Sequence, residues 1–288
     1  MLTARAPAKI NLTLHVLGRR PDGYHDLESL VAFAGIGDAL TFEPGKELAL
    51  TLSGPRAAGL DASAENLVLR AVRELARRID GLRLGSFHLT KCLPVASGIG
   101  GGSSDAAAAL RLIAQYNGLA TTDERVAEAA RGTGADVPVC LEPRARMMSG
   151  LGERLGDPLT PEPLFAVLVN PAVAVETRAV FSRLSLQPGD GTGSPPHPRI
   201  PTAADRPALL SILKKTRNDL EDAACSIAPV IVDVLAVLGA AKGSRLVRMS
   251  GSGATCFALF EDRRPAVRAA RAIRRDHPGW WVKPTVLR

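Results

Sequence analysis

Apolar and polar residues alternate near the start of the chain. Apolar side chains occupy every second position from Ile10 to Val16, which is the period of a strand with one buried face. A turn signal, Pro21-Asp22-Gly23, follows, and a second apolar run extends from Leu27 to Phe33. The two runs predict a β-hairpin with Tyr24 and His25 at its tip.

Shorter patterns predict the other elements of the first half of the chain. Asn66 precedes an amphipathic pattern and is typical of a helix N-cap. A glycine-rich stretch at 98–102 opens directly into a strongly helical sequence. We expect helices at 66–79, 106–116 and 123–131, and strands at 39–43, 48–52, 87–90 and 137–141.

Three prolines, at 158, 161 and 163, mark a boundary between the two halves. We therefore expect an N-terminal domain of residues 1–157 and a C-terminal domain of residues 158–288. The C-terminal half presents strands at 165–170, 246–249, 255–260 and 281–286, and helices at 177–184, 230–238 and 265–275. Leaving additional helices aside, the order β-α-β-β-α-β is typical of a ferredoxin-like arrangement. The predicted fold class is α+β in two lobes.

Segment 187–207 carries few signals for a helix or a strand. Six of its 21 residues are proline and three are glycine. Long loops without secondary structure are uncommon inside compact domains, and those that occur are usually functional or flexible. We therefore expect this segment to be a mobile loop.

The composition is that of a globular protein. Of the 288 residues, 46% are hydrophobic, which is too many for a disordered chain. The longest nearly apolar stretch, 230–241, contains Asp233 and is much shorter than the roughly 20 residues that cross a bilayer. Arg5, Lys9 and Asn11 interrupt the apolar runs at the start, so we expect no secretory signal and a cytoplasmic location.

The cysteines and histidines do not suggest a metal site. The four cysteines, at 92, 140, 225 and 256, lack the C-x-x-C spacing, and we expect them to be reduced and buried. None of the five histidines is spaced i, i+4 from another or paired with a cysteine, so a zinc site is not expected.

The net charge of +7 suits a polyanionic partner of some kind. One alternative is a nucleic-acid-binding protein, because the last predicted helix carries arginines at 263, 264, 268, 271, 274 and 275. No aromatic residue is interleaved with them, and such a run is usually a solvated helix face. The charge alone does not choose among a nucleic acid, an acidic membrane surface and a polyanionic small substrate.

The glycine-rich loop is suited to binding an anion. Three adjacent glycines, Gly100 to Gly102, allow a ligand to approach the backbone closely, and the following helix offers unpaired N–H groups. The loop is not a Walker A motif, since no Gly-Lys-Ser/Thr follows. It also fails the dinucleotide pattern, because the fifth residue after Gly98 is Ser103. A tight loop capped by Ser103, without a ligand, is the simpler alternative.

Three motifs in order resemble those of the GHMP kinase superfamily. They are the Pro-Ala-Lys-Ile-Asn-Leu run at 7–12, the glycine-rich stretch at 94–107 and the Met-Ser-Gly-Ser-Gly-Ala-Thr run at 249–255. Two further matches, at 20–25 and 134–138, are most similar to the kinases that act on cytidylated methylerythritol. The resemblance implies a first lobe similar to a ribosomal protein domain and a ferredoxin-like second lobe.

The resemblance also implies an activity. It is transfer of the γ-phosphoryl group of ATP, with Mg²⁺, to the 2-hydroxyl of the cytidylated methylerythritol, in non-mevalonate isoprenoid precursor synthesis. Asp136 matches the base that accepts the hydroxyl proton, and Lys9 matches the cation that stabilises developing charge. The implied partners are small molecules only, with no nucleic acid or membrane, and the implied state is a monomer or weak dimer. A homoserine or mevalonate kinase of the superfamily is the alternative, which Gly23-Tyr24-His25 disfavours.

The binding residues follow from the same matches. The ATP site would comprise Asn66, Leu67, Lys91, Pro94, Val95, Ala96, Ser97, Gly98, Ile99, Gly100, Gly101, Gly102, Ser103 and Ser104. The acceptor site would comprise Asn11, Tyr24, His25, Asp136, Thr177 and Phe181, with Tyr24, His25 and Phe181 around the cytosine. The metal ligands are not assigned, and Ser103 or Ser104 is the natural guess.

Several of these residues also have simpler explanations. Asp136 fits a turn residue that bonds its own backbone, and Lys9 fits an exposed position on a strand. Asn66 fits a helix cap equally well, and Lys91 fits a solvated lysine at a strand end. Tyr24 fits a capping contact at a turn.

Overall fold

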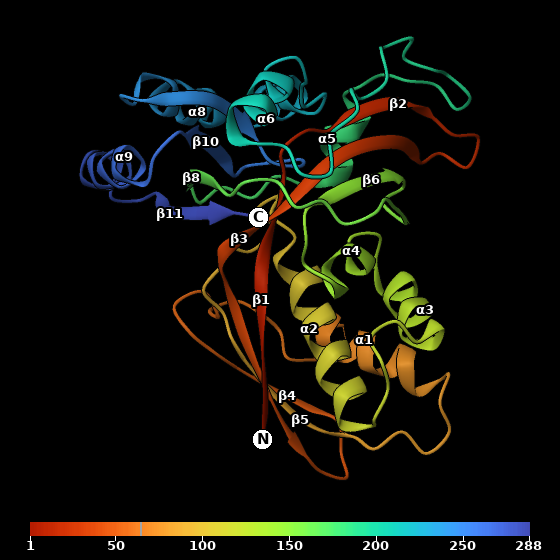
Figure 1. The fold of residues 1–288 in the computed structure, drawn as a ribbon. Coiled ribbons are helices and arrows are strands. Elements are labelled where there is room, and N and C mark those ends of the chain that lie inside the picture. Colours follow the sequence, from red (N-terminus) through yellow and green to blue (C-terminus); the bar gives the residue numbers. More distant parts are fainter. Residues whose placement is uncertain (64) are drawn as a thin grey trace. The chain divides into compact units, whose positions relative to one another are not determined.

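The chain passes several times between two structural units (Figure 1). The computed structural model describes residues 1–63 and 65–288. The first unit contains residues 1–9, 36–95 and 100–143, and the second contains 10–35, 96–99 and 144–288.

The strands of the first unit pair around β3. It contains most of β1 (Leu2–Asn11), the second half of β3 (His25–Pro44), β4 (Ala49–Ser53) and β5 (Gly85–Thr90). The β3 and β5 strands are antiparallel, β4 is parallel to β5, and β1 pairs with β3. The strands expected at 39–43, 48–52 and 87–90 are therefore confirmed within one or two residues at their ends, the first as part of the longer β3.

Four helices complete the first unit: α1 (Leu67–Ala76), α2 (Gly101–Tyr116), α3 (Glu124–Thr133) and α4 (Val137–Leu141). The α1 helix packs against α2 and α3, and α2 packs against α4. Asn66 caps α1, since its Oδ1 accepts a hydrogen bond of 3.0 Å from the backbone N–H of Val68. This cap was expected from the sequence and is confirmed.

Two predictions in this unit need correction. The α2 helix begins at Gly101, not at 106, because Gly100 adopts a left-handed conformation (φ 61°) that starts the helix inside the glycine run. The run at 137–141 is a helix, not a strand, with Pro138 in its first turn and Asp136 at its N-cap. A short buried apolar run has no periodicity that separates the two structures, while proline suits the start of a helix.

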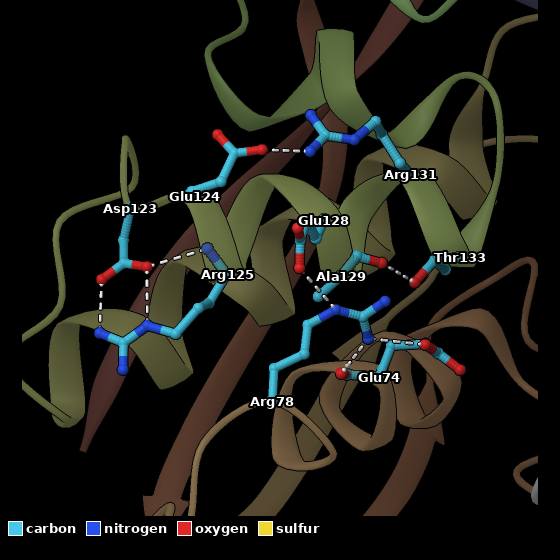
Figure 2. A network of polar contacts seen from close by, with 9 residues as sticks. All are labelled: Glu74, Arg78, Asp123, Glu124, Arg125, Glu128, Ala129, Arg131 and Thr133. Atoms are coloured by element: carbon cyan, nitrogen blue, oxygen red, sulfur yellow. Dashed lines mark hydrogen bonds and ion pairs between the residues drawn. The ribbon is translucent and has the colours of Figure 1, made fainter.

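A network of polar contacts joins α1 to α3 (Figure 2). The Arg78 guanidinium lies 2.8 Å from Glu74 and 3.4 Å from Glu128 of α3. Asp123 caps α3 by accepting a 2.9 Å hydrogen bond from the backbone of Arg125, and Thr133 closes the last turn by donating to Ala129. The Arg78–Glu74 pair is partly buried and Glu128 is exposed, so the ion pairs remain near solvent and contribute little stability, whereas the caps set where α3 begins and ends.

The second unit contains the predicted hairpin. The β2 strand (His15–Arg19) is antiparallel to the first half of β3, with Arg19 opposite His25. The β6 strand (Arg146–Gly150) extends this sheet on β3, and β7 (Arg154–Leu155) pairs with β6. The strand expected at 10–16 is interrupted: β1 ends at Asn11, and the next backbone N–H groups bond to Leu30 and Arg217 instead.

A ferredoxin-like sheet forms the rest of the second unit. The strands β8 (Leu164–Asn170), β9 (Ser244–Met249), β10 (Cys256–Phe260) and β11 (Trp281–Leu287) lie in the order β11-β8-β10-β9, with all neighbours antiparallel. The helices α8 (Val230–Ala240) and α9 (Arg263–Asp276) pack on these strands through a common apolar core. The helices α5 (Thr177–Ser182), α6 (Arg206–Leu213) and α7 (Glu221–Ile227) lie between β8 and α8 in the chain. The predicted β-α-β-β-α-β order and the α+β class are confirmed.

Part of segment 187–207 is hydrogen-bonded to β2. The N–H of Gly189 donates to the carbonyl of Arg19, the N–H of Arg19 donates to Asp190, and the N–H of Thr192 donates to Leu17. A Cβ on Gly18 would lie 2.5 Å from the carbonyl oxygen of Asp190, so this close backbone pairing needs glycine. Gly189, Asp190 and Thr192 thus pair with β2, and the expected loop ends earlier than predicted because α6 begins at Arg206.

Two more expectations concern the cysteines and the membrane. Cys140 and Cys256 are buried, Cys225 is half-buried and Cys92 is exposed, so the expectation that all four are buried is wrong. All four are free thiols. Within the described part of the chain, every helix is too short or too polar to cross a bilayer.

Candidate active site

Lys9 and Asp136 form an ion pair in the first unit. Lys9 lies near the end of β1 with its side chain only 4% exposed, and its Nζ is 2.7 Å from Asp136 Oδ2. Asp136 stands at the N-cap of α4 but makes no capping hydrogen bond, and its side chain is 36% exposed. The simpler explanations do not describe this geometry, because Lys9 is buried and Asp136 does not bond its own turn. The pair presents a carboxylate that is oriented by a cation and still accessible.

The glycine-rich helix start lies against Lys9. A Cβ on Gly100 would be 3.1 Å from the Lys9 Cβ, so the backbone of the loop passes directly over this lysine. The first N–H groups of α2, beginning at Gly101, have no acceptor within the helix, and its first turn carries no acidic residue. Ser104 Oγ donates a 2.6 Å hydrogen bond to the carbonyl of Pro7, which fastens α2 to β1. This end of α2 is suited to an anion close to the Lys9 ammonium.

Leu67 lies beside the same helix start. A Cβ on Gly102 would be 3.2 Å from Leu67 Cδ1, so the start of α1 lies close to the start of α2. Asn66 uses Oδ1 to cap α1 and donates from Nδ2 to the carbonyl of Asp61. Both polar atoms of Asn66 therefore have structural partners.

Lys91 is not a solvated lysine. It is 3% exposed, and its Nζ lies 2.5 Å from Asp38 and 2.6 Å from Asp105. Burial works to lower its pKa, but the two carboxylates outweigh burial and raise it above the usual value. Burial raises the pKa of Asp105 to about 7, against the opposing effect of Lys91.

Residues 96–99 belong to the second unit, where the loop at 249–255 supports them. We call 249–255 the C-terminal glycine loop. Ser250 Oγ donates a 3.0 Å hydrogen bond to the carbonyl of Gly98, and the N–H of Thr255 donates to Ser97. Gly98 has a positive φ of 73°, and a Cβ there would lie 2.5 Å from the carbonyl oxygen of Ser250, so the contact requires glycine.

Asn11 is held by hydroxyl groups of the second unit. Its Nδ2 donates a 2.7 Å hydrogen bond to Ser29 Oγ, and Ser29 in turn donates to the carbonyl of Thr13. Its backbone N–H donates to Ser250 Oγ, 3.1 Å away. Asn11 is 2% exposed, so these contacts fix the orientation of its amide.

His25 and Phe181 stack in the second unit. Their ring centroids are 4.8 Å apart with an interplanar angle of 29°. Burial, assisted by the Arg19 charge, lowers the pKa of His25 and favours the neutral imidazole. Tyr24 is 63% exposed, and Thr177 bonds Ser252 of the C-terminal glycine loop, 2.8 Å away. The structure thus brings His25 and Phe181 together directly, while the Tyr24 ring is open to solvent.

The two serines suggested from the sequence as metal ligands differ in burial and in hydrogen bonding. Ser104 is 1% exposed and donates to Pro7, so its hydroxyl is committed to holding α2 in place. Ser103 is half-buried in the first turn of α2. Over residues 1–63 and 65–288, no group of three or more histidines, cysteines or acidic residues is arranged to hold a metal ion.

Comparison with known proteins identifies the family. The sequence pattern of the GHMP kinases N terminal domain matches residues 66–142, and that of the GHMP kinases C terminal domain matches 205–279. The chain is 62% identical to 4-diphosphocytidyl-2-C-methyl-D-erythritol kinase of Methylobacterium radiotolerans, over 100% of this chain and 99% of that protein. It is 58% identical to the kinase of the same name from Methylorubrum extorquens strain PA1, with the same coverage.

The chain belongs to the 4-diphosphocytidyl-2-C-methyl-D-erythritol kinase family of GHMP kinases. A crystal structure of 4-(cytidine 5'-diphospho)-2C-methyl-D-erythritol kinase agrees, with a TM-score of 0.77, 34% identity and 99% of each chain covered. Homoserine kinase from Cytophaga hutchinsonii has the same fold, with a TM-score of 0.70 at 19% identity. The resemblance to GHMP kinases seen in the sequence motifs is therefore confirmed, and members of this kinase family use ATP.

Several residues of the site carried no sequence signal. Asp38 lies within a strand and Asp105 within an alanine-rich helix, and neither belongs to a pattern that marks a loop. Asn218 donates to the carbonyls of Met249 and Gly251 and so holds the C-terminal glycine loop. Ser29 orients Asn11 from a buried position in β3. Asp38 is one of four acidic residues in β3, so its position in the sequence did not indicate a buried partner.

Proposed function

We propose that this chain transfers the γ-phosphoryl group of ATP to the 2-hydroxyl of 4-diphosphocytidyl-2-C-methyl-D-erythritol, giving the 2-phosphate and ADP. Membership of the kinase family supports the substrate and the reaction. The Lys9–Asp136 ion pair of 2.7 Å, next to the glycine-rich start of α2, is the observation that supports the chemistry. This reaction belongs to non-mevalonate isoprenoid precursor synthesis.

In this proposal Asp136 is the general base. Lys9 binds Asp136 Oδ2, which leaves the other carboxylate oxygen to accept the proton of the attacking hydroxyl. A positioned base of this kind contributes about 10² to 10⁴ in rate. The buried Lys9 ammonium orients the carboxylate, and its charge stabilises the negative charge of the phosphoryl group during transfer.

The phosphates would bind at the start of α2. The N–H groups of Gly101, Gly102 and Ser103 have no acceptor within the helix, and the glycines leave no side chain in the way. We propose the thirteen sequence-predicted ATP residues other than Lys91 as the lining of this site, with Leu67 beside the glycine run.

The magnesium ion would be held mainly by ATP itself. Mg²⁺ commonly keeps several waters and binds through substrate phosphates with one or two protein oxygens. The described residues fit this mode, because they offer a half-buried hydroxyl at Ser103 but no cluster of acidic residues. When bound, the ion would neutralise charge on the β- and γ-phosphates.

The second unit supplies the candidate acceptor residues. The exposed Tyr24 ring and the partly buried His25–Phe181 stack offer aromatic faces for cytosine. Because its pKa is lowered, His25 is neutral near pH 7 and presents one ring nitrogen as donor and one as acceptor to the base edge. Asn11 and Thr177 are proposed as polar contacts to the acceptor.

Some wider properties are also proposed. The ligands are small molecules, so we propose a cytoplasmic monomer or weak dimer without a nucleic-acid partner. We propose that 1–157 and 158–288 correspond to the N-terminal and C-terminal domains of the GHMP kinases. The patterns matched at 66–142 and 205–279 lie inside these limits.

The decisive experiment compares acceptors. Mg²⁺-dependent ADP release is measured with the cytidylated methylerythritol, with homoserine and with mevalonate, at equal concentrations. Turnover on the cytidylated alcohol alone is expected. Turnover on homoserine or mevalonate instead would assign another activity of the superfamily, and turnover on none by protein that binds ATP would show that the proposed acceptor is wrong.

A further inference from the structure

A buried lysine and two buried aspartates meet in the first unit. Lys91 follows β5, Asp38 lies in β3, and Asp105 is in the second turn of α2. Their exposed fractions are 3%, 1% and 3%. The Lys91 Nζ lies 2.5 Å from Asp38 Oδ2 and 2.6 Å from Asp105 Oδ2. A single ammonium thus joins two carboxylates from different elements.

The same group holds the backbone where the glycine-rich loop begins. Asp38 Oδ1 accepts hydrogen bonds from the N–H groups of Cys92, at 2.5 Å, and Leu93, at 2.8 Å. Leu93 is the last residue before the loop that starts at Pro94. Asp38 therefore fixes the entry to the loop with one oxygen and binds Lys91 with the other.

The exit of the loop is held by Asp105. This residue lies four positions after Gly101, where α2 begins, and it receives a hydrogen bond from the Lys91 ammonium. A Cβ on Gly101 would be 3.2 Å from Lys91 Nζ, so the ammonium lies against the first residue of the helix. Entry and exit are therefore joined through one buried cation.

We propose that Asp38, Lys91 and Asp105 clamp the two ends of the phosphate loop and thereby set the affinity for ATP, with Lys91 a positioning residue and not a phosphate contact. This inference rests on the proposed ATP site. It replaces the sequence-based expectation that Lys91 itself binds the nucleotide. Two of the three Lys91 donors are already used by the aspartates.

The electrostatics of the group agree with a structural cation. Removing Lys91 would leave two carboxylates buried without compensation, which is strongly destabilising. Asp105 Oδ1 has no hydrogen-bond partner within the described ranges, whereas both carboxylate oxygens of Asp38 accept hydrogen bonds. Asp105 accepts one hydrogen bond where Asp38 accepts three, so Asp105 is the better site for a graded test.

The two possible roles of Lys91, phosphate contact and positioning residue, predict opposite effects of Asp105→Ala on ATP affinity. If Lys91 contacts phosphate, the substitution frees the ammonium and ATP binds equally well or more tightly. If the clamp positions the loop, the substitution loosens the start of α2 and ATP binds more weakly. Asp105→Asn keeps an oxygen that can accept from Lys91 and is therefore expected to restore most of the affinity.

The experiment measures the ATP dissociation constant and the steady-state KM values for the wild type, D105A, D105N, K91M and the K91M/D105A double variant. For D105A we expect Kd and KM for ATP to rise about tenfold, which is within the range for residues that share one polar network. The KM for the acceptor should stay within about twofold. The double variant should bind ATP no more weakly than K91M, because both changes open the same clamp.

Several outcomes would overturn the proposal. They are unchanged or tighter ATP binding by D105A, an additive double variant, or equal losses for ATP and acceptor. Thermal melting of each variant shows whether it is folded, and D105A with D105N carries the test where K91M does not fold. Glu128→Gln is the matched control, since it removes an exposed carboxylate that lies 3.4 Å from Arg78 and outside the clamp.

The proposed function can fail separately. Wild-type protein that binds ATP but does not phosphorylate the acceptor would refute the acceptor assignment, while the ATP constants would still test the clamp. Wild-type protein that does not bind ATP would overturn both.

Discussion

Ser104 Oγ donates a hydrogen bond to the carbonyl oxygen of Pro7 over 2.6 Å, and so joins the first turns of α2 to β1. Pro7 is two residues before Lys9, and Ser104 is three residues after Gly101. One hydroxyl therefore relates the strand that carries the candidate catalytic lysine to the helix that would hold the phosphates. Because Ser104 is buried, no water can replace the bond without a rearrangement.

Ser104→Ala is expected to destabilise the fold. The substitution leaves the Pro7 carbonyl without its partner, and a buried unsatisfied group costs about 1–3 kcal/mol. Urea unfolding of the wild type and the variant measures this loss. Ser103→Ala is the matched control: it should cost less stability but raise the Mg²⁺ concentration needed for half-maximal turnover. Equal stabilities of S104A and the wild type would mean that the hydroxyl does not hold α2.

Asp136→Asn is expected to lower turnover without weakening ATP binding. The amide keeps the shape of the side chain but is not a base, so the loss should be about 10² to 10⁴ in kcat. Single-turnover phosphoryl transfer and equilibrium ATP binding separate the two effects. Near-native turnover of the folded variant would show that another group accepts the proton. Asp123→Asn, at the N-cap of α3, is a control for the loss of one carboxylate in this unit.

Phe181→Ala is expected to weaken binding of the acceptor. The ring stacks on His25 and is proposed to border the cytosine, and a stacking contact with a base is worth about 1–3 kcal/mol. KM for the cytidylated alcohol, and inhibition by free CDP, should worsen together by about fivefold or more, while KM for ATP should not change. A larger increase in the KM for ATP than in the inhibition constant of CDP would show that Phe181 does not border the cytosine. Phe165→Ala is the control for the loss of one ring, because Phe165 and Phe181 are both partly buried against the apolar core of this unit.

Much of the fold follows from local patterns in the sequence. The cap at Asn66, the hairpin around residues 20–24 and the β-α-β-β-α-β order of the second unit all depend on short-range signals, and the structure confirms them. The alternation of apolar and polar residues at 10–16 did not predict which side chains are buried. Its polar members Asn11, Thr13 and His15 are as buried as its apolar ones, because hydroxyl groups, backbone and neighbouring rings cover both sides.

Distant pairings explain what the sequence did not predict. Lys91 meets Asp38 across 53 positions, and Asn218 meets Met249 across 31, and no periodicity records such contacts. The pairing of segment 187–207 with β2 was missed for a related reason. The composition of the segment indicates the conformational freedom of its residues, but it cannot indicate the strand edge with which residues 189–192 pair. The candidate residues were found through motif resemblance, while the residues that position them needed the structure.

The buried carboxyl of Asp105 is expected to make stability depend on pH. Its pKa, raised by burial to about 7, lies above the value near 3.9 of an unfolded aspartate, so the folded state binds the extra proton between these values. Lys91 and Asp38 are the charged groups that act on it. Because the folded state binds more protons than the unfolded state in this range, the contribution of Asp105 to the free energy of unfolding decreases as pH rises from about 4 to 7.

His15 acts in the opposite direction over part of the same range. Burial, with the charges of Arg217 and His197, lowers its pKa to about 4, so the unfolded state binds the proton and this group stabilises the fold as pH rises from about 4 to 6.5. The Asp105 contribution is therefore isolated by comparing Asp105→Asn with the wild type in urea unfolding at pH 5, 6 and 7.5. The variant lacks the titration but keeps an acceptor for Lys91, so its stability relative to the wild type should improve steadily as pH rises. A difference that is constant across this range would mean that Asp105 is ionised throughout, and that the cation of Lys91 dominates over burial in setting its charge.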